Sequence, residues 1–225
     1  MNYEQARFNM IEQQIRPWDV LDAKVLALLS TVKREDFVPA ALRALAFVDM
    51  EIPLRSHPDQ AAPVGQCMLA PRLEARMLQD LALQPHEKVL EVGAGSGYMA
   101  ALLAHQAQRV ISLEIDPEMA RLAHANLQKA GVHNAEVRQA DGAAGAQVEG
   151  PFDAIVLSGS VAEVPQSLLS QLKIGGRLMA VVGDLPVMQA KLITRTGERA
   201  YRTQELWDTV VPRLAHVPEH AAFSF

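Results

Sequence analysis

The sequence contains very little cysteine and few aromatic residues. One of its 225 residues is a Cys, which excludes a disulfide framework within the chain and a zinc site made of several cysteines. The seven histidines show no metal-ligand spacing, so we expect no bound metal. Aromatic residues make up 5% of the chain, which argues against the base-stacking surfaces that bind single-stranded nucleic acid.

Long apolar runs and concentrated charge of one sign are also missing. No run reaches the ~18 apolar residues of a membrane span, and the first residues lack the basic and then apolar pattern of a signal peptide. The 21 basic and 26 acidic residues give a net charge of −5, and no Lys/Arg run offers the basic surface that a duplex requires. We therefore expect a cytoplasmic protein that contacts neither membranes nor nucleic acid.

The order of the predicted elements indicates an α/β fold in a single domain. Residues 1–80 are predicted to be helical, with Asp19 capping a second helix, a linker-like loop between residues 51 and 66, and a helix after Pro71. Residues 81–183 alternate short apolar strands with helices, which predicts βαβ units and a parallel sheet. Residues 184–225 are predicted to close the sheet with a strand hairpin. Cys67 is expected to be a small core side chain.

The strongest local motif is a glycine-rich turn between a predicted strand and a predicted helix. The strand is Val89–Val92, the turn contains Gly93, Gly95 and Gly97, and the helix begins near Tyr98. Glycines let a ligand approach the backbone, and the first N–H groups of the helix point toward that ligand. The G-x-G-x-G spacing is one residue shorter than the dinucleotide pattern, which favours a cofactor without a pyrophosphate, such as S-adenosyl-L-methionine. A turn without a ligand and a nicotinamide-dependent oxidoreductase are the alternatives.

Acidic residues lie near the ends of successive predicted strands, where open α/β sheets bind ligands. Glu114 ends the second strand and can accept hydrogen bonds from both ribose hydroxyls. Asp141 can accept one from an adenine amino group, or it belongs to a simple Asp-Gly turn. Glu91 either helps to hold the ammonium group of the methionine moiety or is a charge at a strand end. The expected cofactor site comprises Glu91, Gly93, Ala94, Gly95, Ser96, Gly97, Glu114, Asp141 and Gly142.

Several motifs along the chain resemble one enzyme family. They are Met10–Arg16, the R-E-D-F-V-P run at Arg34–Pro39, Val89–Tyr98 ending in G-S-G-Y, Asp141-Gly142, and Leu172–Leu178. Together they are similar to motifs of the protein-L-isoaspartate O-methyltransferases, which are class I S-adenosylmethionine-dependent methyltransferases. The resemblance implies a Rossmann-like, seven-stranded, mostly parallel sheet flanked by helices, with an N-terminal helical region on the acceptor side. It also implies that the chain esterifies the carboxylate of isoaspartyl residues in damaged proteins or peptides.

The acceptor half of the family pattern is altered. The family segment Q-T-I-S-x-P, whose serine is the assigned active-site residue, corresponds to Gln66–Pro71, so Leu69 occupies the serine position. A leucine neither donates nor accepts a hydrogen bond. The C-terminal V-P-L-T of the family appears as Val211–Leu214, and the loop at residues 55–63 is longer than the family's connection. No catalytic residue is therefore assigned, and the acceptor side is expected to be lined by Met68, Leu69, Ala70 and Pro71.

The missing serine leaves three hypotheses open. A carboxylate acceptor has a pKa near ~4 and is ionised at neutral pH, so methyl transfer to it needs no general base. Isoaspartyl methylation is therefore compatible with Leu69. The alternatives are a methyltransferase with a different acceptor, for which the apolar Leu69 suits a more apolar substrate, and a non-catalytic protein that binds S-adenosylmethionine or its demethylated product.

Overall fold

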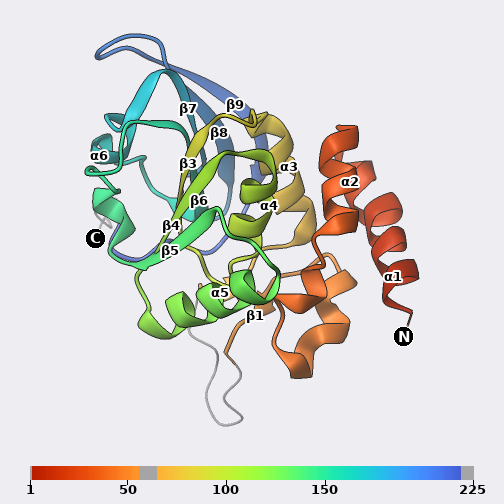
Figure 1. Ribbon diagram of the computed structural model, residues 1–225. Helices are drawn as coiled ribbons and strands as arrows, with labels where there is room; N and C mark the ends of the chain where they lie inside the picture. Colours follow the sequence, from red (N-terminus) through yellow and green to blue (C-terminus); the bar gives the residue numbers. More distant parts are fainter. Residues whose placement is uncertain (1, 56–64, 219–225) are drawn as a thin grey trace, which may run out of the picture.

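The centre of the molecule is a sheet of seven strands in the order β5-β4-β3-β6-β7-β8-β9. The computed structural model describes residues 2–55 and 65–218 (Figure 1). β3, β4, β5, β6 and β7 run parallel, β8 runs antiparallel to β7, and β9 runs antiparallel to β8. The expected mostly parallel sheet with a closing hairpin is confirmed. The strands are β3 (Lys88–Val92), β4 (Arg109–Glu114), β5 (Ala135–Gln139), β6 (Phe152–Val161), β7 (Leu172–Val182), β8 (Met188–Arg195) and β9 (Tyr201–Thr209).

Apolar side chains on both faces hold this sheet between two layers. Alternate residues of one strand point to opposite faces, so Val89 belongs to one apolar cluster and its neighbour Leu90 to another. The first cluster packs under α3 (Pro71–Leu81), α4 (Tyr98–Gln106) and α5 (Pro117–Lys129). The second packs under α6 (Gln166–Leu169), the short helical turn Gly142–Ala144 and residues near the C-terminus. Burial on both faces explains why the central strands are continuously apolar.

The N-terminal region is helical and lies outside α3 and α4, away from the sheet (Figure 1). It consists of α1 (Tyr3–Met10), a π-helical turn (Ile11–Ile15), α2 (Ala23–Thr31) and short 3-10 segments at Arg16–Trp18, Arg34–Asp36 and Ala40–Phe47. The prediction that Asp19 caps the second helix is wrong. The carboxylate of Asp22 accepts hydrogen bonds from the N–H groups of Lys24 and Val25, while Asp19 has a left-handed backbone conformation.

The predicted linker between residues 51 and 66 contains paired strands at its two ends. β1 (Ile52–Pro53) pairs antiparallel with β2 (Cys67–Met68), and the N–H of Leu54 donates to the carbonyl of Gln66. The long loop noted in the sequence falls largely on residues 56–64, outside the described residues. The expectation for Cys67 is wrong, because its side chain is half-buried and its Sγ lies 3.7 Å from a carboxylate oxygen of Glu51.

The R-E-D-F-V-P run fixes the N-terminal region to the rest of the molecule. Arg34 is fully buried, forms an ion pair with Glu74 of α3, and donates to the carbonyl of Leu69 at 2.7 Å. Its guanidinium carbon lies 5.1 Å from the centre of the Tyr98 ring at the start of α4. Arg34 therefore joins α3, α4 and the segment that precedes α3.

This burial makes Arg34 a strong test of fold stability. We expect Arg34→Met to lower the free energy of unfolding by about 3–5 kcal/mol, because Glu74 would remain buried without its cation. The matched control is Arg16→Met, which removes an exposed pair with Glu12 and should cost less than about 1 kcal/mol. Urea denaturation measures both. Equal losses in the two variants would contradict the anchoring role of Arg34.

Candidate active site

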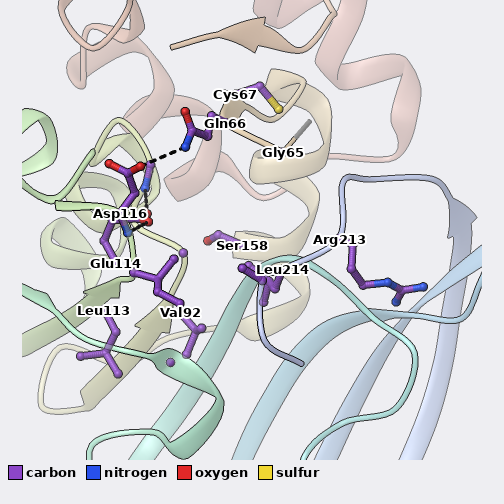
Figure 2. A pocket seen from close by; sticks show the side chains of 15 residues that line it. Gly65, Gln66, Cys67, Val92, Leu113, Glu114, Asp116, Ser158, Arg213 and Leu214 are labelled. Carbon is purple, nitrogen blue, oxygen red and sulfur yellow. Dashed lines mark hydrogen bonds between the residues drawn. The ribbon is translucent and has the colours of Figure 1, made fainter. Parts of the chain in front are cut away.

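A pocket of about 170 Å³ lies at the carboxyl edge of the sheet (Figure 2). The ends of β3 and β4 form one side, through Val92, Gly93, Leu113 and Glu114. Two further sides are formed by Gly65–Cys67 at the β1–β2 pair and by the C-terminal segment Val211–Val217. This is the edge at which open α/β sheets bind ligands. Its lining residues are Gly65, Gln66, Cys67, Val92, Gly93, Gly95, Leu113, Glu114, Ile115, Asp116, Gly142, Ser158, Arg213, Leu214 and Ala215.

The glycine-rich turn has the backbone conformation that its sequence predicts. Gly93 and Gly97 have φ values of +94° and +82°, which other residues rarely adopt. A Cβ at Gly97 would also lie 3.0 Å from the carbonyl oxygen of Ala123 in α5, so the turn and α5 approach closely. The turn leads directly into α4, where the N–H of Tyr98 donates to the hydroxyl of Ser96 at 3.2 Å.

Glu114 bridges the glycine turn and the start of α5. One carboxylate oxygen accepts from the N–H of Gly95 at 2.9 Å, and the other accepts from the N–H of Asp116 at 3.0 Å. The residue is 8% exposed and lines the pocket. Each carboxylate oxygen can accept a second hydrogen bond, so the two oxygens can receive a vicinal diol from the pocket side.

Asp116 is a pocket residue that the sequence reasoning missed. Its carboxylate caps α5 by accepting from the N–H groups of Glu118 and Met119, and it also accepts from Arg55 and Gln66. These bonds hold the pKa of Asp116 below its ordinary value, although partial burial opposes them. Figure 2 shows the bond from Gln66, which fastens the β1–β2 hairpin to the pocket wall. Arg55 and Gln66 come from a distant part of the chain, so no spacing in the sequence indicates these contacts.

Asp141 and Gly142 lie at the same edge with different surroundings. Gly142 lines the pocket. A Cβ at this position would clash with the side chain of Val92, so glycine is the residue that fits here. The carboxylate of Asp141 is about half exposed, accepts from the N–H of Ala143 at 3.0 Å, and lies 3.0 Å from Nδ1 of His216. These contacts lower the pKa of Asp141. Its suggested bond to an adenine amino group stays a prediction.

The C-terminal segment Val211–Val217 crosses the end of β6 and closes one side of the pocket. Ser160 donates from its N–H to the carbonyl of Pro212 at 2.7 Å and accepts from the N–H of Leu214 at 2.9 Å. The Leu214 side chain lies so close to Gly93 and Gly159 that a Cβ at either would fall within 3 Å of it. In Figure 2, Leu214 faces the pocket whereas the Arg213 side chain extends away from it. No local pattern in the sequence predicts this crossing.

Glu91 is a completely buried carboxylate behind the glycine turn. Its two oxygens accept hydrogen bonds from the hydroxyls of Ser112 at 2.5 Å and Ser158 at 2.8 Å. Burial, together with the nearby carboxylates of Glu74 and Glu114, nevertheless raises the pKa of Glu91 to about 8. Ser158 follows the apolar run Ala154–Leu157 in β6, so the rule that ligands bind at strand ends could have identified it.

A smaller cavity of about 20 Å³ adjoins the pocket on the acceptor side. Four residues line both spaces: Cys67, Gly93, Gly95 and Ser158. The cavity is also lined by Met68, Leu69, Glu74, Glu91, Ala94, Ser96 and Met99. The structure thus brings the expected Met68 and Leu69 beside the expected glycine turn. Leu69 is 5% exposed and packs with Val181, Met188 and Val211. Ala70 is buried in the same cluster, and Pro71 begins α3.

Within residues 2–55 and 65–218, no three His, Cys, Asp or Glu side chains are arranged to hold a metal ion. Within the same ranges, no helix has both the length and the apolar character required to cross a membrane.

The buried Glu91 predicts a measurable pH dependence of stability. Its pKa rises from an ordinary 4.5 to about 8 in the folded chain, so between these values the folded state binds more protons than the unfolded state. We therefore expect the free energy of unfolding, measured by urea denaturation without added ligand, to fall as the pH rises through this range. Glu91→Gln cannot ionise and should show a flatter profile and exceed the wild type above neutrality. Parallel profiles for the two proteins would refute this.

Comparison with known proteins places the chain in a family. The family profile described as protein-L-isoaspartate(D-aspartate) O-methyltransferase matches residues 5–212. A protein-L-isoaspartate O-methyltransferase of Herpetosiphon aurantiacus is 36% identical over 98% of this chain and 97% of its own. Protein-L-isoaspartate O-methyltransferase 1 of Syntrophobacter fumaroxidans is 42% identical over 86% of each chain.

Solved structures agree with the fold. A structure named protein-L-isoaspartate O-methyltransferase superposes with a TM-score of 0.79 at 22% identity, covering 93% of this chain and 66% of that one. A putative protein-L-isoaspartate O-methyltransferase of Plasmodium falciparum, in complex with S-adenosyl-L-homocysteine, superposes with a TM-score of 0.77 at 20% identity. The match covers 95% of this chain and 98% of that one. The matched family profile and the two bacterial relatives show that this chain belongs to the protein-L-isoaspartate O-methyltransferase family.

Proposed function

We propose that this chain transfers a methyl group from S-adenosyl-L-methionine to the carboxylate of isoaspartyl residues in proteins or peptides. The observation that carries the proposal is the position of Glu114, whose carboxylate faces a pocket directly beside the positive-φ glycine turn. The family name and the relatives supply the acceptor. The proposed location is the cytoplasm, as the sequence predicts.

The residues at this edge fit the cofactor. The glycine turn leaves room for a ligand against the backbone, and Glu114 offers acceptors for ribose hydroxyls. Gly142 and Val92 provide a narrow apolar wall for an adenine, with Asp141 beyond it. We assign Glu91, Gly93, Ala94, Gly95 and Ser96 to the methionine and ribose side because they line the small cavity, and Gly97 because it ends the same turn.

The transfer requires positioning rather than proton transfer. When bound, S-adenosyl-L-methionine supplies a methyl group that forms a bond to a carboxylate oxygen while its bond to sulfur breaks and leaves the electron pair on sulfur. The acceptor is ionised at neutral pH and needs no base. The chain's own part is to orient the acceptor and exclude water, for which Met68, Leu69 and Leu214 supply apolar surface. In this proposal, residues 1–80 form the side that binds the acceptor and residues 81–183 form the sheet core that binds the cofactor. Residues 184–225 close the sheet.

A different methyl acceptor is the second candidate. It is favoured by Leu69, whose side chain is buried in an apolar cluster at the position where the family has its active-site serine. The same cofactor site would then act on a more apolar substrate. Binding of the cofactor without transfer to any acceptor would instead indicate a non-catalytic protein.

An isoaspartyl peptide and a labelled methyl donor test the acceptor. We expect transfer by the wild type and a larger kcat for Leu69→Ser, because loss of one orienting hydroxyl typically costs about 10²–10³ in rate. Leu69→Ala is the matched control, since it removes the same packing without adding a hydroxyl. Transfer to components of a cell extract but not to the isoaspartyl peptide would replace the proposed acceptor. Equal rates for the Ser and Ala variants would exclude Leu69 as the cause of any low activity.

Calorimetry tests the ribose assignment. We expect Glu114→Ala to weaken binding of S-adenosyl-L-homocysteine by about 10- to 100-fold, because hydrogen bonds to a charged group are lost. Glu136→Ala on β5 removes an exposed carboxylate remote from the pocket and should leave affinity unchanged. Unchanged affinity for Glu114→Ala would refute the assignment, and tight NAD binding without S-adenosylmethionine binding would refute the proposed cofactor.

A further inference from the structure

A rim of exposed apolar side chains lies beside the C-terminal wall of the pocket, where the β7–β8 turn meets the segment that follows β9. Met188 and Thr209 form the last register pair of β8 and β9, so Val187 and Val210 are the next residues beyond that pair. Leu185, Val187 and Val210 are 72%, 60% and 46% exposed. Single exposed apolar side chains are common, whereas a group of them beside a pocket is typical of a binding surface.

Arg213 brings a positive charge to this rim. Its Nη2 donates to the carbonyl of Gly183 at 2.9 Å and forms an ion pair with the carboxylate of Asp184, and both residues belong to the β7–β8 turn. Its Nη1 is buried and donates no hydrogen bond to any of residues 2–55 and 65–218. A buried donor of a charged group is costly to leave without an acceptor, so this side of the guanidinium is suited to receive one.

The pair with Asp184 leaves the guanidinium available to another carboxylate. The side chain of Asp184 is 50% exposed, and an ion pair so open to solvent contributes little to stability. A guanidinium binds a carboxylate best through two parallel N–H···O bonds. An incoming carboxylate that bonds to both Nη1 and Nη2 therefore satisfies the buried donor and displaces Asp184.

The direction of the Arg213 side chain decides which carboxylate it binds. Leu214 faces the pocket, whereas Arg213 extends away from it (Figure 2). The carboxylate that accepts the methyl group must lie at the pocket, aligned with the cofactor. Arg213 therefore meets a different group of the acceptor, farther along the peptide chain, and the exposed Leu185 and Val187 offer apolar contacts to the same stretch of peptide.

We propose that this rim binds the acceptor peptide beside its isoaspartyl residue, and that Arg213 selects peptides with a second, acidic residue there. The inference rests on the proposed function, because it requires an isoaspartyl peptide as the acceptor. The family pattern V-P-L-T has a leucine where this chain has Arg213. The preference for acidic acceptors is thus a property of this chain and not of the family pattern.

Paired isoaspartyl peptides test the proposal. The two members of a pair differ only in Glu or Gln at one position close to the isoaspartyl residue, each flanking position is tried in turn, and labelled methyl transfer gives kcat and KM. We expect a pair in which the wild-type kcat/KM is about 10-fold higher for the Glu peptide, mainly through KM. Arg213→Leu should lower this ratio to about one, and Arg213→Lys should keep part of it, because lysine retains the charge without the planar fork.

Three further variants separate the charge from its surroundings. Arg202→Leu removes an exposed arginine at the other end of the β8–β9 hairpin, opposite Thr194, and should leave the ratio unchanged. Val187→Ser should raise KM for both peptides by a similar factor of about three to ten, because apolar contact is lost. Asp184→Asn removes the competing carboxylate and should raise the ratio, a change that a purely structural role of Arg213 does not predict. This variant carries the test if Arg213→Leu does not fold.

Three results would overturn the proposal and leave the proposed function intact, because the peptides would still be methylated. They are equal kcat/KM for the Glu and Gln members of every pair, a preference that persists in Arg213→Leu, and a ratio that does not rise in Asp184→Asn. Failure of the wild type to methylate any isoaspartyl peptide would instead remove the proposed function, and this inference with it.

Discussion

The buried guanidinium of Arg34 holds the two halves of the site together. It contacts the carboxylate of Glu74, the carbonyl of Leu69 and the face of Tyr98, which lie on α3, the segment before α3, and α4. A buried cation without these partners would cost several kcal/mol, on the order of 3–5. Arg34 therefore helps to hold the segment before α3, which carries Met68 and Leu69, beside the glycine turn.

Two chain segments from outside the strand-helix core complete the pocket. The β1–β2 hairpin is fastened to the start of α5 by Arg55 and Gln66, and the C-terminal segment is fastened to β6 at Ser160. Because Asp116 both caps α5 and receives these hairpin bonds, the wall of the pocket is continuous with the helix that follows Glu114. Core strand ends and the two added segments thus line the same pocket.

Local patterns predicted the parts of the site that depend on neighbouring residues in the chain. Gly93 and Gly97 require positive φ, and Glu114 ends a strand, so sequence spacing was sufficient to place them. Asp19 was predicted wrongly because two acidic residues compete for the same helix start, and Cys67 because its surroundings come from a distant segment. A second acidic residue, Asp22, makes the helix cap, and the pairing of β1 with β2 draws Cys67 to the pocket. Leu214 and His216 reach the site only because the C-terminal segment turns back across the sheet edge.

The sequence by itself determined the parallel sheet, the glycine turn and the family resemblance, because periodicity and motif spacing are properties of short stretches of chain. It also predicts that Leu69 occupies the position of the family's serine. Only the tertiary structure decided that Leu69 is buried in an apolar cluster and that Glu74 shares a cavity with Glu91. The burial of a side chain and the charge around it depend on segments that meet through folding, such as Arg34 and Glu74. The spacing of residues along the chain does not specify which distant residues come into contact.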